Sequence, residues 1–309
     1  YAGSQRYPVH WGGDPAALWD DLGNLWHGGL GLGLSGIPFW SIDIGGFGGT
    51  PSPELYIRWI QVGMFVSHPR AHGPIGREPW VFGETAEQVF RAYGTIRYQL
   101  MPYIWDEAVH ATTSMAPFHQ PLLFQWQSDP NTATIDDEYL FGRQILVAPI
   151  MDQSNTRKVY LPEGHWVDPW TDTLLTGAAW IQIDAPITHL PLYVKTDAII
   201  PMIDPVLSTD DADFSRIHLH MYPRHGSETA IELPNKRTLH VKVTRKHDTY
   251  TINAWGLEAL IIPHIHGTGT QRSYAGAPIA LAEGKIHEIA RLSVEPEFQL
   301  ATQIGFTPE

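Results

Sequence analysis

The chain has 309 residues and a mass of 34.7 kDa, more than one ordinary domain of about 100 to 150 residues, so we expect two or three domains. Hydrophobic residues make up 43% and charged residues 17% of the sequence, which allows sizeable cores and excludes a disordered chain. The net charge of −13 and the lack of any basic run argue against nucleic acids and anionic membranes as partners.

Composition also bears on where the protein works. No apolar stretch reaches the roughly 18 residues of a membrane span, and residues 1–8 lack the charged and apolar regions of a secretion signal. The chain has no cysteine, which excludes disulfides, thiolate metal sites and a cysteine nucleophile. We therefore expect a soluble, unprocessed protein with a cytoplasmic location.

The first half of the chain alternates helical patterns with short apolar runs. Apolar side chains in residues 17–26 recur at helical spacing after Asp14, which predicts a helix that ends in the glycine-rich residues 28–33. The apolar run at residues 37–44 predicts a strand. The glycine-rich residues 45–49 predict a functional loop at its carboxyl end.

Two more helices are predicted from their capping residues. Ser52 as N-cap, with Pro53 at the first helical position, predicts the start of one of them. Thr85 and Gln88 form a capping box that predicts the start of the other. Pro102 must kink or break this second helix.

Strands and helices that alternate up to about residue 150, with a last apolar run at residues 121–124, predict a parallel α/β arrangement. Beyond residue 145 the apolar runs follow one another without helices between them. These predicted strands cover residues 145–147, 159–161, 180–183 and 198–200. The second half is therefore expected to be all β.

The last hundred residues show a period of two. Apolar and polar residues alternate in residues 217–222 and 239–244, which predicts antiparallel strands with one wet face. Turns expected at residues 234–235 and 264–269 fit a β-sandwich. The histidines expected to line wet strand faces are His218, His220, His264 and His266.

The first candidate site is the run YPVHWGGD at residues 7–14. It places the carboxylate of Asp14 after Trp11 and two glycines, in a loop that leads into the predicted helix. Asp14 is either the N-cap of this helix or a general acid in the apolar surroundings of Trp11. The pattern alone leaves both alternatives open.

The second candidate segment is the strand end at residues 39–47, which delivers Asp43, Trp40 and Phe47 into a glycine loop. The whole chain carries 12 Trp, 12 Tyr and 11 Phe, several of them beside glycine or proline. Flat apolar faces beside polar groups suit sugar rings. The structural alternative is that these rings fill the cores of β-rich domains.

The third candidate segment is SHPRAHG at residues 67–73. His68 and His72 stand four residues apart, a spacing that suits a metal ion when both lie on one helix. Pro69 breaks such a helix, and no glutamate completes the pattern. We therefore expect no metal ion at these histidines.

Several of these segments together resemble glycoside hydrolase family 31, which contains α-glucosidases and α-xylosidases. The segments that resemble the family's catalytic barrel are residues 3–14, 33–47 and 70–73. Those that resemble the β-domain after the barrel are YLPEGHWVD at residues 160–168 and VKTDAIIP at residues 194–201. The segments follow the family's order, and the resemblance ends near residue 203.

The resemblance implies a retaining hydrolase built on a (β/α)8 TIM barrel, in which two catalytic carboxyls lie about 5 to 5.5 Å apart. It places Asp14 at the position of the general acid/base. The residues that it implies for the sugar in the −1 subsite are Trp11, Trp40, Phe47 and His72, and the supporting residues are Asp43 and Arg70. Nothing in the resemblance calls for a cofactor or a metal ion.

The resemblance implies a nucleophile on an earlier barrel strand, and only 13 residues precede Asp14, so we expect the nucleophile to be absent from this chain. We expect the C-terminal part of a (β/α)8 barrel at residues 1–150, a proximal β-domain at 151–203 and a distal β-sandwich at 204–309. The missing N-terminal part is then a required partner, and the sequence leaves self-association open.

The activity that the resemblance implies is hydrolysis of terminal non-reducing α-xylosyl or α-glucosyl residues from an α-linked oligosaccharide or glycoside. The motif at residues 39–41 is more similar to the α-xylosidase branch. We expect this chain to be inactive by itself. The alternative function is a non-catalytic carbohydrate-binding or structural subunit that kept the motifs through ancestry.

Overall fold

The computed structural model describes residues 3–7, 9–247, 249–266, 274–275, 278–282 and 284–293, and its contacts divide the chain into two compact units. Unit 1 comprises Tyr1–Arg97, Glu107–Glu163 and Ala178–Pro191, and unit 2 comprises Tyr98–Asp106, Gly164–Gly177 and Leu192–Glu309. The predicted boundaries near residues 150 and 203 stay a prediction. None of the described helices combines the length and the apolar character needed to cross a membrane.

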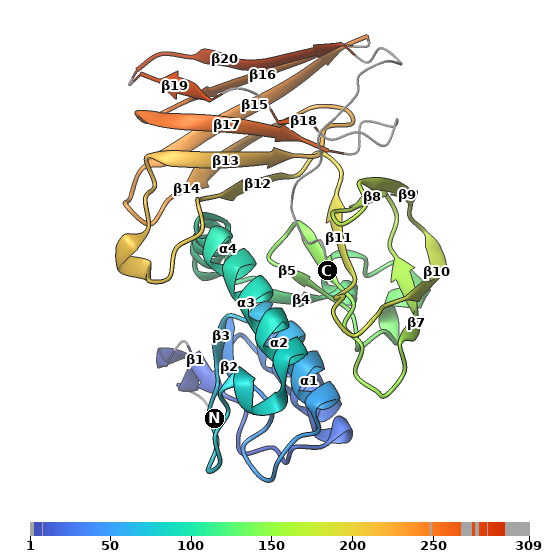
Figure 1. The fold of residues 1–309 in the computed structure, drawn as a ribbon. Helices are drawn as coiled ribbons and strands as arrows, with labels where there is room; N and C mark the ends of the chain where they lie inside the picture. Colours follow the sequence, from blue (N-terminus) through green and yellow to red (C-terminus); the bar gives the residue numbers. More distant parts are fainter. Residues whose placement is uncertain are drawn as a thin grey trace. The chain divides into compact units, whose positions relative to one another are not determined.

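Unit 1 begins with a parallel sheet of three strands. β1 (Val9–Trp11), β2 (Phe39–Asp43) and β3 (His68–Arg70) pair in that order. The helices α1 (Trp19–Leu34) and α2 (Pro53–Met64) connect successive strands (Figure 1). These two βαβ units confirm the predicted parallel α/β arrangement.

The two faces of β2 have different partners. Trp40 and, one residue past the strand, Ile44 face the helices. A Cβ atom added to Gly29 of α1 would lie 2.2 Å from the Trp40 ring, and one added to Gly63 of α2 would lie 2.8 Å from Ile44. Because successive side chains alternate across a strand, Asp43 lies on the opposite face. One face of β2 therefore belongs to the core and the other carries a carboxylate.

The helix α1 differs from the prediction at both ends. It begins at Trp19 with Leu18 as N-cap, and it continues through the glycine-rich residues 28–33, which were expected to end it. Two of these glycines are needed for close packing, since an added Cβ would lie 2.2 Å from Trp40 at Gly29 and 2.9 Å from Pro117 at Gly33. The glycines bring the helix close to its neighbours instead of breaking it.

Neighbouring glycines of α1 allow a matched test of this packing. Gly29→Ala should lower the free energy of unfolding by about 1 to 3 kcal/mol, because the new methyl group overlaps the Trp40 ring. Gly28→Ala should raise it by up to about 1 kcal/mol, because its methyl group meets open space and alanine favours the helix. Urea unfolding of both variants checks the pair, and shifts of the same sign would contradict the packing argument.

The start of α2 confirms its prediction, whereas the start of the next helix does not. Ser52 Oγ accepts a hydrogen bond from the Leu55 amide at 3.2 Å, with Pro53 at the first helical position. α3 (Glu84–Gln99) begins one residue before Thr85, so the predicted capping box is wrong. A threonine inside the helix cannot cap it.

The break at Pro102 is confirmed, because α4 (Met101–Ser114) begins directly after α3 ends. The strand expected at residues 121–124 is shifted. β4 (His119–Pro121) ends at a proline that is the N-cap of the short helix α5 (Leu122–Gln125), so the apolar residues after it are helical.

The other strand pairs within unit 1 are antiparallel, so the parallel arrangement predicted up to about residue 150 is confirmed for β1, β2 and β3 and is wrong for the strands from residue 119 onward. β4, β5 (Tyr139–Phe141) and β6 (Ile145–Val147) pair in order, and β7 (Thr156–Leu161) pairs with β10 (Ala179–Asp184). The 3-10 helices of unit 1 are η1 (Ser4–Arg6), η2 (Pro79–Phe82) and η3 (Pro130–Ala133). The strands predicted at residues 145–147, 159–161 and 180–183 are confirmed.

Unit 2 consists of a small antiparallel group and a β-sandwich. The small group pairs β8 (His165–Asp168) with β9 (Thr173–Thr176) and with β11 (Leu192–Lys195). One sheet of the sandwich contains β12 (Ile199–Met202), β13 (Arg216–Met221), β17 (Ala259–Ile265), β18 (Tyr274–Ala275) and β19 (Ile279–Leu281). The other contains β14 (Ser227–Glu232), β15 (Thr238–Lys246), β16 (Thr249–Trp255) and β20 (His287–Ser293). A 3-10 helix, η4, spans Thr209–Asp211.

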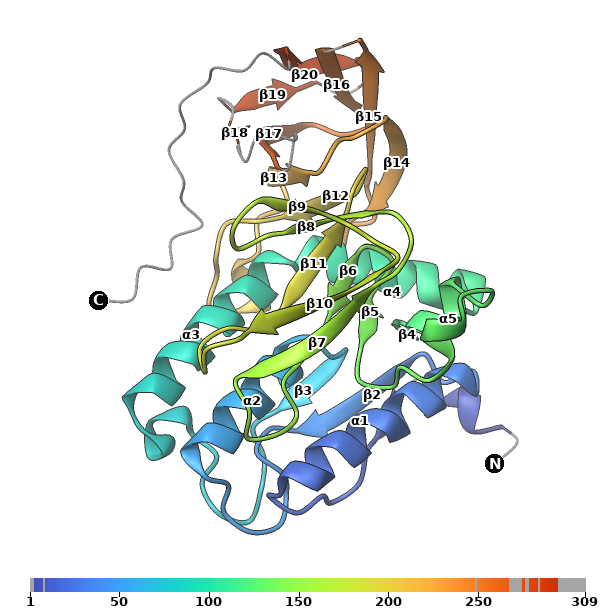
Figure 2. The same cartoon turned by 90° about the vertical axis from the view of Figure 1, so that its right-hand side faces the viewer.

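The two sheets of the sandwich lie face to face (Figure 2). Their core is built from alternate residues of β13 and β15, including Ile217, Leu219, Val241 and Val243, which confirms the period-two pattern. The turn predicted at residues 234–235 joins β14 to β15.

Three expectations for this region need correction or fall outside the structure. β13 pairs with β17 in parallel, so the antiparallel prediction is wrong for this pair and holds for β14, β15 and β16. His220 and His266 are buried, so their strand face is not wet along its whole length. The turn expected at residues 264–269 lies partly outside the described residues, which omit residues 267–273.

Candidate active site

The candidate site lies in the loops that follow β1, β2 and β3 of unit 1. Asp14 follows β1, Phe47 follows β2 and His72 follows β3. Because the three strands are parallel, these loops leave the same edge of the sheet (Figure 1). Catalytic residues of α/β proteins gather at this carboxyl edge.

Asp14 lies five residues before the first residue of α1 and is exposed to solvent. The N-cap of α1 is Leu18, so the alternative that Asp14 caps the helix is wrong. The segment is instead tied to the helix by Asp21, whose Oδ2 accepts from the Ala16 amide at 2.5 Å. Within the part of the chain that the structure describes, the Asp14 carboxylate makes no hydrogen bond or ion pair.

Two glycines shape the turn before Asp14. A Cβ atom on Gly12 would lie 2.2 Å from Leu25 of α1, and Gly13 has a φ of +96°, which side chains rarely adopt. Gly12 also donates its amide to the Ser41 carbonyl of β2 at 3.0 Å. The glycines of the sequence motif therefore allow the chain to turn at the sheet edge and present Asp14.

Backbone hydrogen bonds join the loop after β1 to the loop after β2. The Pro15 carbonyl accepts from the amides of Phe47 and Gly48, at 2.8 and 3.0 Å. The Ala17 amide donates to the Gly48 carbonyl at 2.7 Å. The residue next to Asp14 is thus bonded to the backbone of Phe47, so the sheet edge holds the carboxylate and the aromatic residue near each other.

Each strand of the sheet also contributes one member of a second group. Asp43 of β2 is fully buried, and both of its carboxylate oxygens accept hydrogen bonds from Arg70 of β3, the longer one at 3.3 Å. The Arg70 guanidinium lies 5.1 Å from the ring centroid of Trp11 of β1. Because Arg70 neutralises Asp43, this carboxylate is poorly suited to act as a second acid or base.

Phe47 and His72 form the third group. Their ring centroids lie 5.5 Å apart, with Phe47 half-buried and His72 exposed. An aromatic surface beside a ring nitrogen that can donate or accept a hydrogen bond suits a sugar, which presents C–H faces and hydroxyl groups.

Arg77 holds this group in place, and the sequence reasoning missed it. It is buried, and its guanidinium donates to the carbonyls of Gly46, Phe47 and Gly49 at 2.7 to 3.1 Å. The Tyr56 hydroxyl donates to the Arg77 carbonyl at 2.5 Å. The only signal in the sequence is a single arginine in a loop of glycine and proline, which does not reveal its partners.

The prediction for Trp40 needs correction. Trp40 is 1% exposed and packs under α1, with its ring 5.0 Å from Trp26 and 5.4 Å from His119. A ring on the helix side of β2 cannot contact a ligand at the opposite face. We therefore leave Trp40 out of the candidate site and retain Trp11, which is 46% exposed.

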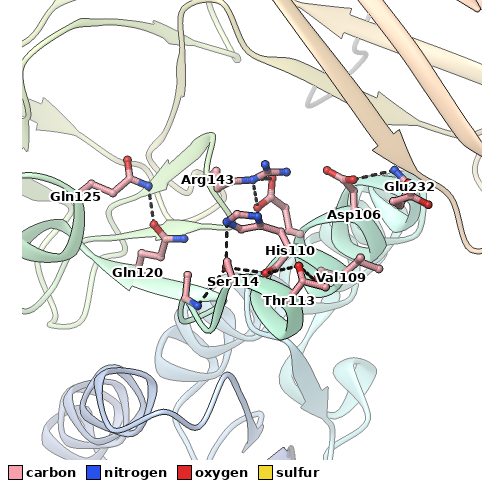
Figure 3. Close-up of polar contacts among 11 residues, drawn as sticks. Asp106, Val109, His110, Thr113, Ser114, Gln120, Gln125, Arg143 and Glu232 are labelled. Carbon is pink, nitrogen blue, oxygen red and sulfur yellow. Dashed lines mark hydrogen bonds and ion pairs between the residues drawn. The ribbon is translucent and has the colours of Figure 1, made fainter.

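A separate polar cluster lies at α4 and contains no residue that the sequence singled out. Arg143 Nε donates to both carboxylate oxygens of buried Glu107, at 3.0 and 2.9 Å. Ser114 Oγ donates to the His110 carbonyl at 2.7 Å (Figure 3). Burial, followed by the charge of Arg143, lowers the pKa of His110. The ion pair neutralises its own buried carboxylate, so this cluster is structural.

The chain is similar to two family profiles that follow one another along it. Residues 1–107 match the profile described as "Glycosyl hydrolases family 31 TIM-barrel domain". Residues 115–200 match the profile described as "Glycosyl hydrolase family 31 C-terminal domain". The first range contains every residue of the candidate site.

Curated relatives include both glucosidases and xylosidases. The chain is 38% identical over 237 residues to alpha-glucosidase 2 of Bacillus thermoamyloliquefaciens, which covers 75% of this chain and 30% of the relative. It is 33% identical over 248 residues to an alpha-xylosidase of Emericella nidulans, which covers 77% of this chain and 32% of the relative. The chain thus spans about a third of the length of these relatives.

Solved structures of GH31 enzymes are also similar to this chain. A GH31 alpha-xylosidase of Xanthomonas citri matches with a TM-score of 0.82 and 26% identity, over 96% of this chain and 36% of that one. A GH31 dextranase of Flavobacterium johnsoniae, solved as a mutant complexed with isomaltotriose, matches with a TM-score of 0.79 and 30% identity, over 86% and 37% of the two chains.

Proposed function

We propose, since this chain belongs to glycoside hydrolase family 31, that it is the C-terminal part of the catalytic barrel of a retaining α-glycoside hydrolase, with the β-domains that follow the barrel. The match covers about a third of the length of the relatives. The remaining barrel strands and the nucleophile belong to a further part of the enzyme, which corresponds to the rest of that length. The observation that carries the proposal is Asp14, an exposed carboxylate without a partner among the described residues, at the carboxyl edge of the parallel sheet.

In the proposed reaction Asp14 acts as a general acid in the first step and as a general base in the second. It first gives its proton to the glycosidic oxygen while the nucleophile attacks the anomeric carbon, and the leaving group departs as an alcohol. As a carboxylate it then takes a proton from a water molecule, which releases the sugar from the nucleophile and restores Asp14 to its acid form. Asp14 forms no salt bridge with a described residue, which suits this cycle because a fixed cation would oppose protonation.

The remaining groups bind the sugar. Trp11 and Phe47 offer apolar surface to its C–H faces, and His72 bonds its hydroxyl groups. Asp43 and Arg70 keep Trp11 in place through the cation–π contact. The proposed substrates carry terminal non-reducing α-glucosyl or α-xylosyl residues, as the names of the relatives suggest. Since Trp40 packs in the core, the motif at residues 39–41 does not decide between these two sugars.

The function is tested by complementation. The purified chain is assayed on p-nitrophenyl α-glucoside and α-xyloside, alone and after coexpression with the N-terminal part of a family 31 barrel that carries the nucleophile. We expect no turnover by the chain alone and turnover by the assembled protein. Turnover by the chain alone would contradict the shared site, and sugar binding without turnover by the assembled protein would favour the non-catalytic alternative.

A further inference from the structure

Four histidines in unit 2 form a continuous stack between β13 and β17, which we name the histidine ladder: His218, His264, His220 and His266. His218 Nδ1 lies 2.9 Å from His264 Nε2, and His220 Nδ1 lies 2.9 Å from His266 Nε2. The central rings, His264 and His220, are parallel within 3° with centroids 4.3 Å apart. The ladder therefore joins two hydrogen-bonded pairs by stacking.

A carboxylate closes each end of the ladder. Asp204 Oδ1 lies 3.0 Å from His218 Nε2, and Asp204 also pairs with Arg216 at 2.8 Å. At the other end, Asp172 Oδ1 lies 2.8 Å from His266 Nδ1. Asp172 belongs to the turn between β8 and β9 and has a φ of +54°. The ladder thus connects this turn to the segment that follows β12, which contains Asp204.

The carboxylates determine which nitrogen of each neutral ring carries the proton, because every nitrogen–nitrogen hydrogen bond needs one donor and one acceptor. Asp204 accepts from His218 Nε2, so His218 Nδ1 accepts from His264 Nε2. Asp172 accepts from His266 Nδ1, so His266 Nε2 accepts from His220 Nδ1. One pair therefore carries its protons on Nε2 and the other on Nδ1.

The same geometry limits how many protons the ladder can hold. With one added proton, a pair can still form its nitrogen–nitrogen hydrogen bond, because one of the two facing nitrogens can remain without a proton. A second proton would place two N–H groups against each other across 2.9 Å. The pair must then open, and with it the side-chain link between β13 and β17.

The surroundings keep the inner rings neutral. Burial, followed by the effects of the neighbouring His218 and His266, lowers the pKa of His264 to about 4. Burial also lowers the pKa of His220, followed by the effects of His266, His264 and His218. Among the described residues, the other ionisable groups at the ladder are Asp204 and Arg216 at one end, and Asp172, the stacked ring of Tyr222 and nearby Asp168 at the other.

We propose that the histidine ladder is an acid-sensitive lock, which holds β13, β17 and the turn between β8 and β9 together while its inner rings are neutral and opens when they are protonated. An unfolded histidine has a pKa of about 6.5, so the open state binds protons first as the pH falls. Stability from the lock is complete above about pH 6.5 and is lost between that pH and about 4.

The first test uses the unaltered chain. Long-range proton–nitrogen NMR spectra of the imidazole rings at neutral pH should show His218 and His264 protonated on Nε2, and His220 and His266 protonated on Nδ1. Any other distribution among the four rings would overturn the assignment on which the lock depends. This measurement does not require a variant that folds.

The second test measures opening. Amide hydrogen exchange in β13 and β17, corrected for intrinsic rates, should show an opening equilibrium that rises between roughly tenfold and a hundredfold from pH 7 to pH 4.5. In the double variant His218→Phe, His264→Phe the rings can still stack, Asp204 keeps Arg216, and the rise should shrink at least about fivefold. His240→Phe is the control, because His240 stacks on Trp255 in the other sheet. An equal rise in the double variant and the wild type would overturn the lock.

Discussion

Replacing Asp14 with alanine should lower turnover of an unactivated α-linked disaccharide by the assembled enzyme roughly 10²- to 10⁴-fold, because the leaving alcohol then departs without a proton. The free energy of unfolding should stay unchanged. Asp14 is exposed, makes no hydrogen bond within the described part of the chain and does not cap α1, so its side chain supports no structure. Initial rates and urea unfolding of the same preparation measure both effects.

The leaving group separates the two steps in which Asp14 acts. An activated aryl glycoside needs no protonation in the first step, so Asp14→Ala should slow that step much less. Azide can replace the water that Asp14 would activate, and it should restore the second step and yield an α-glycosyl azide. A β-glycosyl azide would contradict a retaining mechanism.

Asp20→Ala is the matched control for Asp14→Ala. Asp20 is an exposed carboxylate six residues away, in the first turn of α1. Its loss should cost at most about 1 kcal/mol through the helix dipole and should leave turnover intact. If Asp14→Ala instead hydrolyses the disaccharide near the wild-type rate, Asp14 is not the general acid.

The largest expected effect on stability belongs to Arg58 in α2. This arginine is buried, and its two terminal nitrogens donate to Asn155 Oδ1 at 2.9 Å and to the carbonyls of Ala185 and His189 at 2.7 and 3.0 Å. It also donates to Gln61 Oε1 at 3.1 Å. Arg58 thus supplies donors to a loop of unit 1 that has no regular structure of its own.

Arg58→Met should lower the free energy of unfolding of unit 1 by about 3 to 5 kcal/mol, because it keeps the apolar stem but removes the donor from the buried Ala185 carbonyl and the buried Gln61 amide oxygen. Arg91→Met is the control, since Arg91 is 75% exposed and its one ion pair among the described residues is with Glu87 one turn away. Its effect should stay below about 0.5 kcal/mol. Urea unfolding that finds equal losses for both variants would contradict the role given to Arg58.

Features that depend on neighbouring residues could be predicted from the sequence alone. Ser52 and Pro53 gave the start of α2, because an N-cap bonds an amide only three residues away. Pro102 gave the break between α3 and α4, because a proline lacks the amide that a continuous helix needs. The family could also be recognised from the sequence, because its motifs are short runs of neighbouring residues such as residues 7–14.

The tertiary structure decided the features that depend on distant partners. The glycines at residues 28–33 predict the end of a helix. The packing of Trp40 against Gly29 explains why the helix instead continues through them. That same contact turns Trp40 from an expected sugar-binding residue into a core residue. Local pattern could not show this, because alternation along a strand separates two faces without saying which one a helix covers.

The histidine ladder shows the same limit most clearly. Two His-X-His motifs lie 46 residues apart, and alternation alone assigns each to a solvated strand face. Parallel pairing of β13 with β17 brings them onto one face in stacking register, and Asp172 and Asp204 arrive from other segments of unit 2. Burial and charge at a site are sums over all the segments that fold around it, so only the tertiary structure could decide whether these histidines meet water or each other.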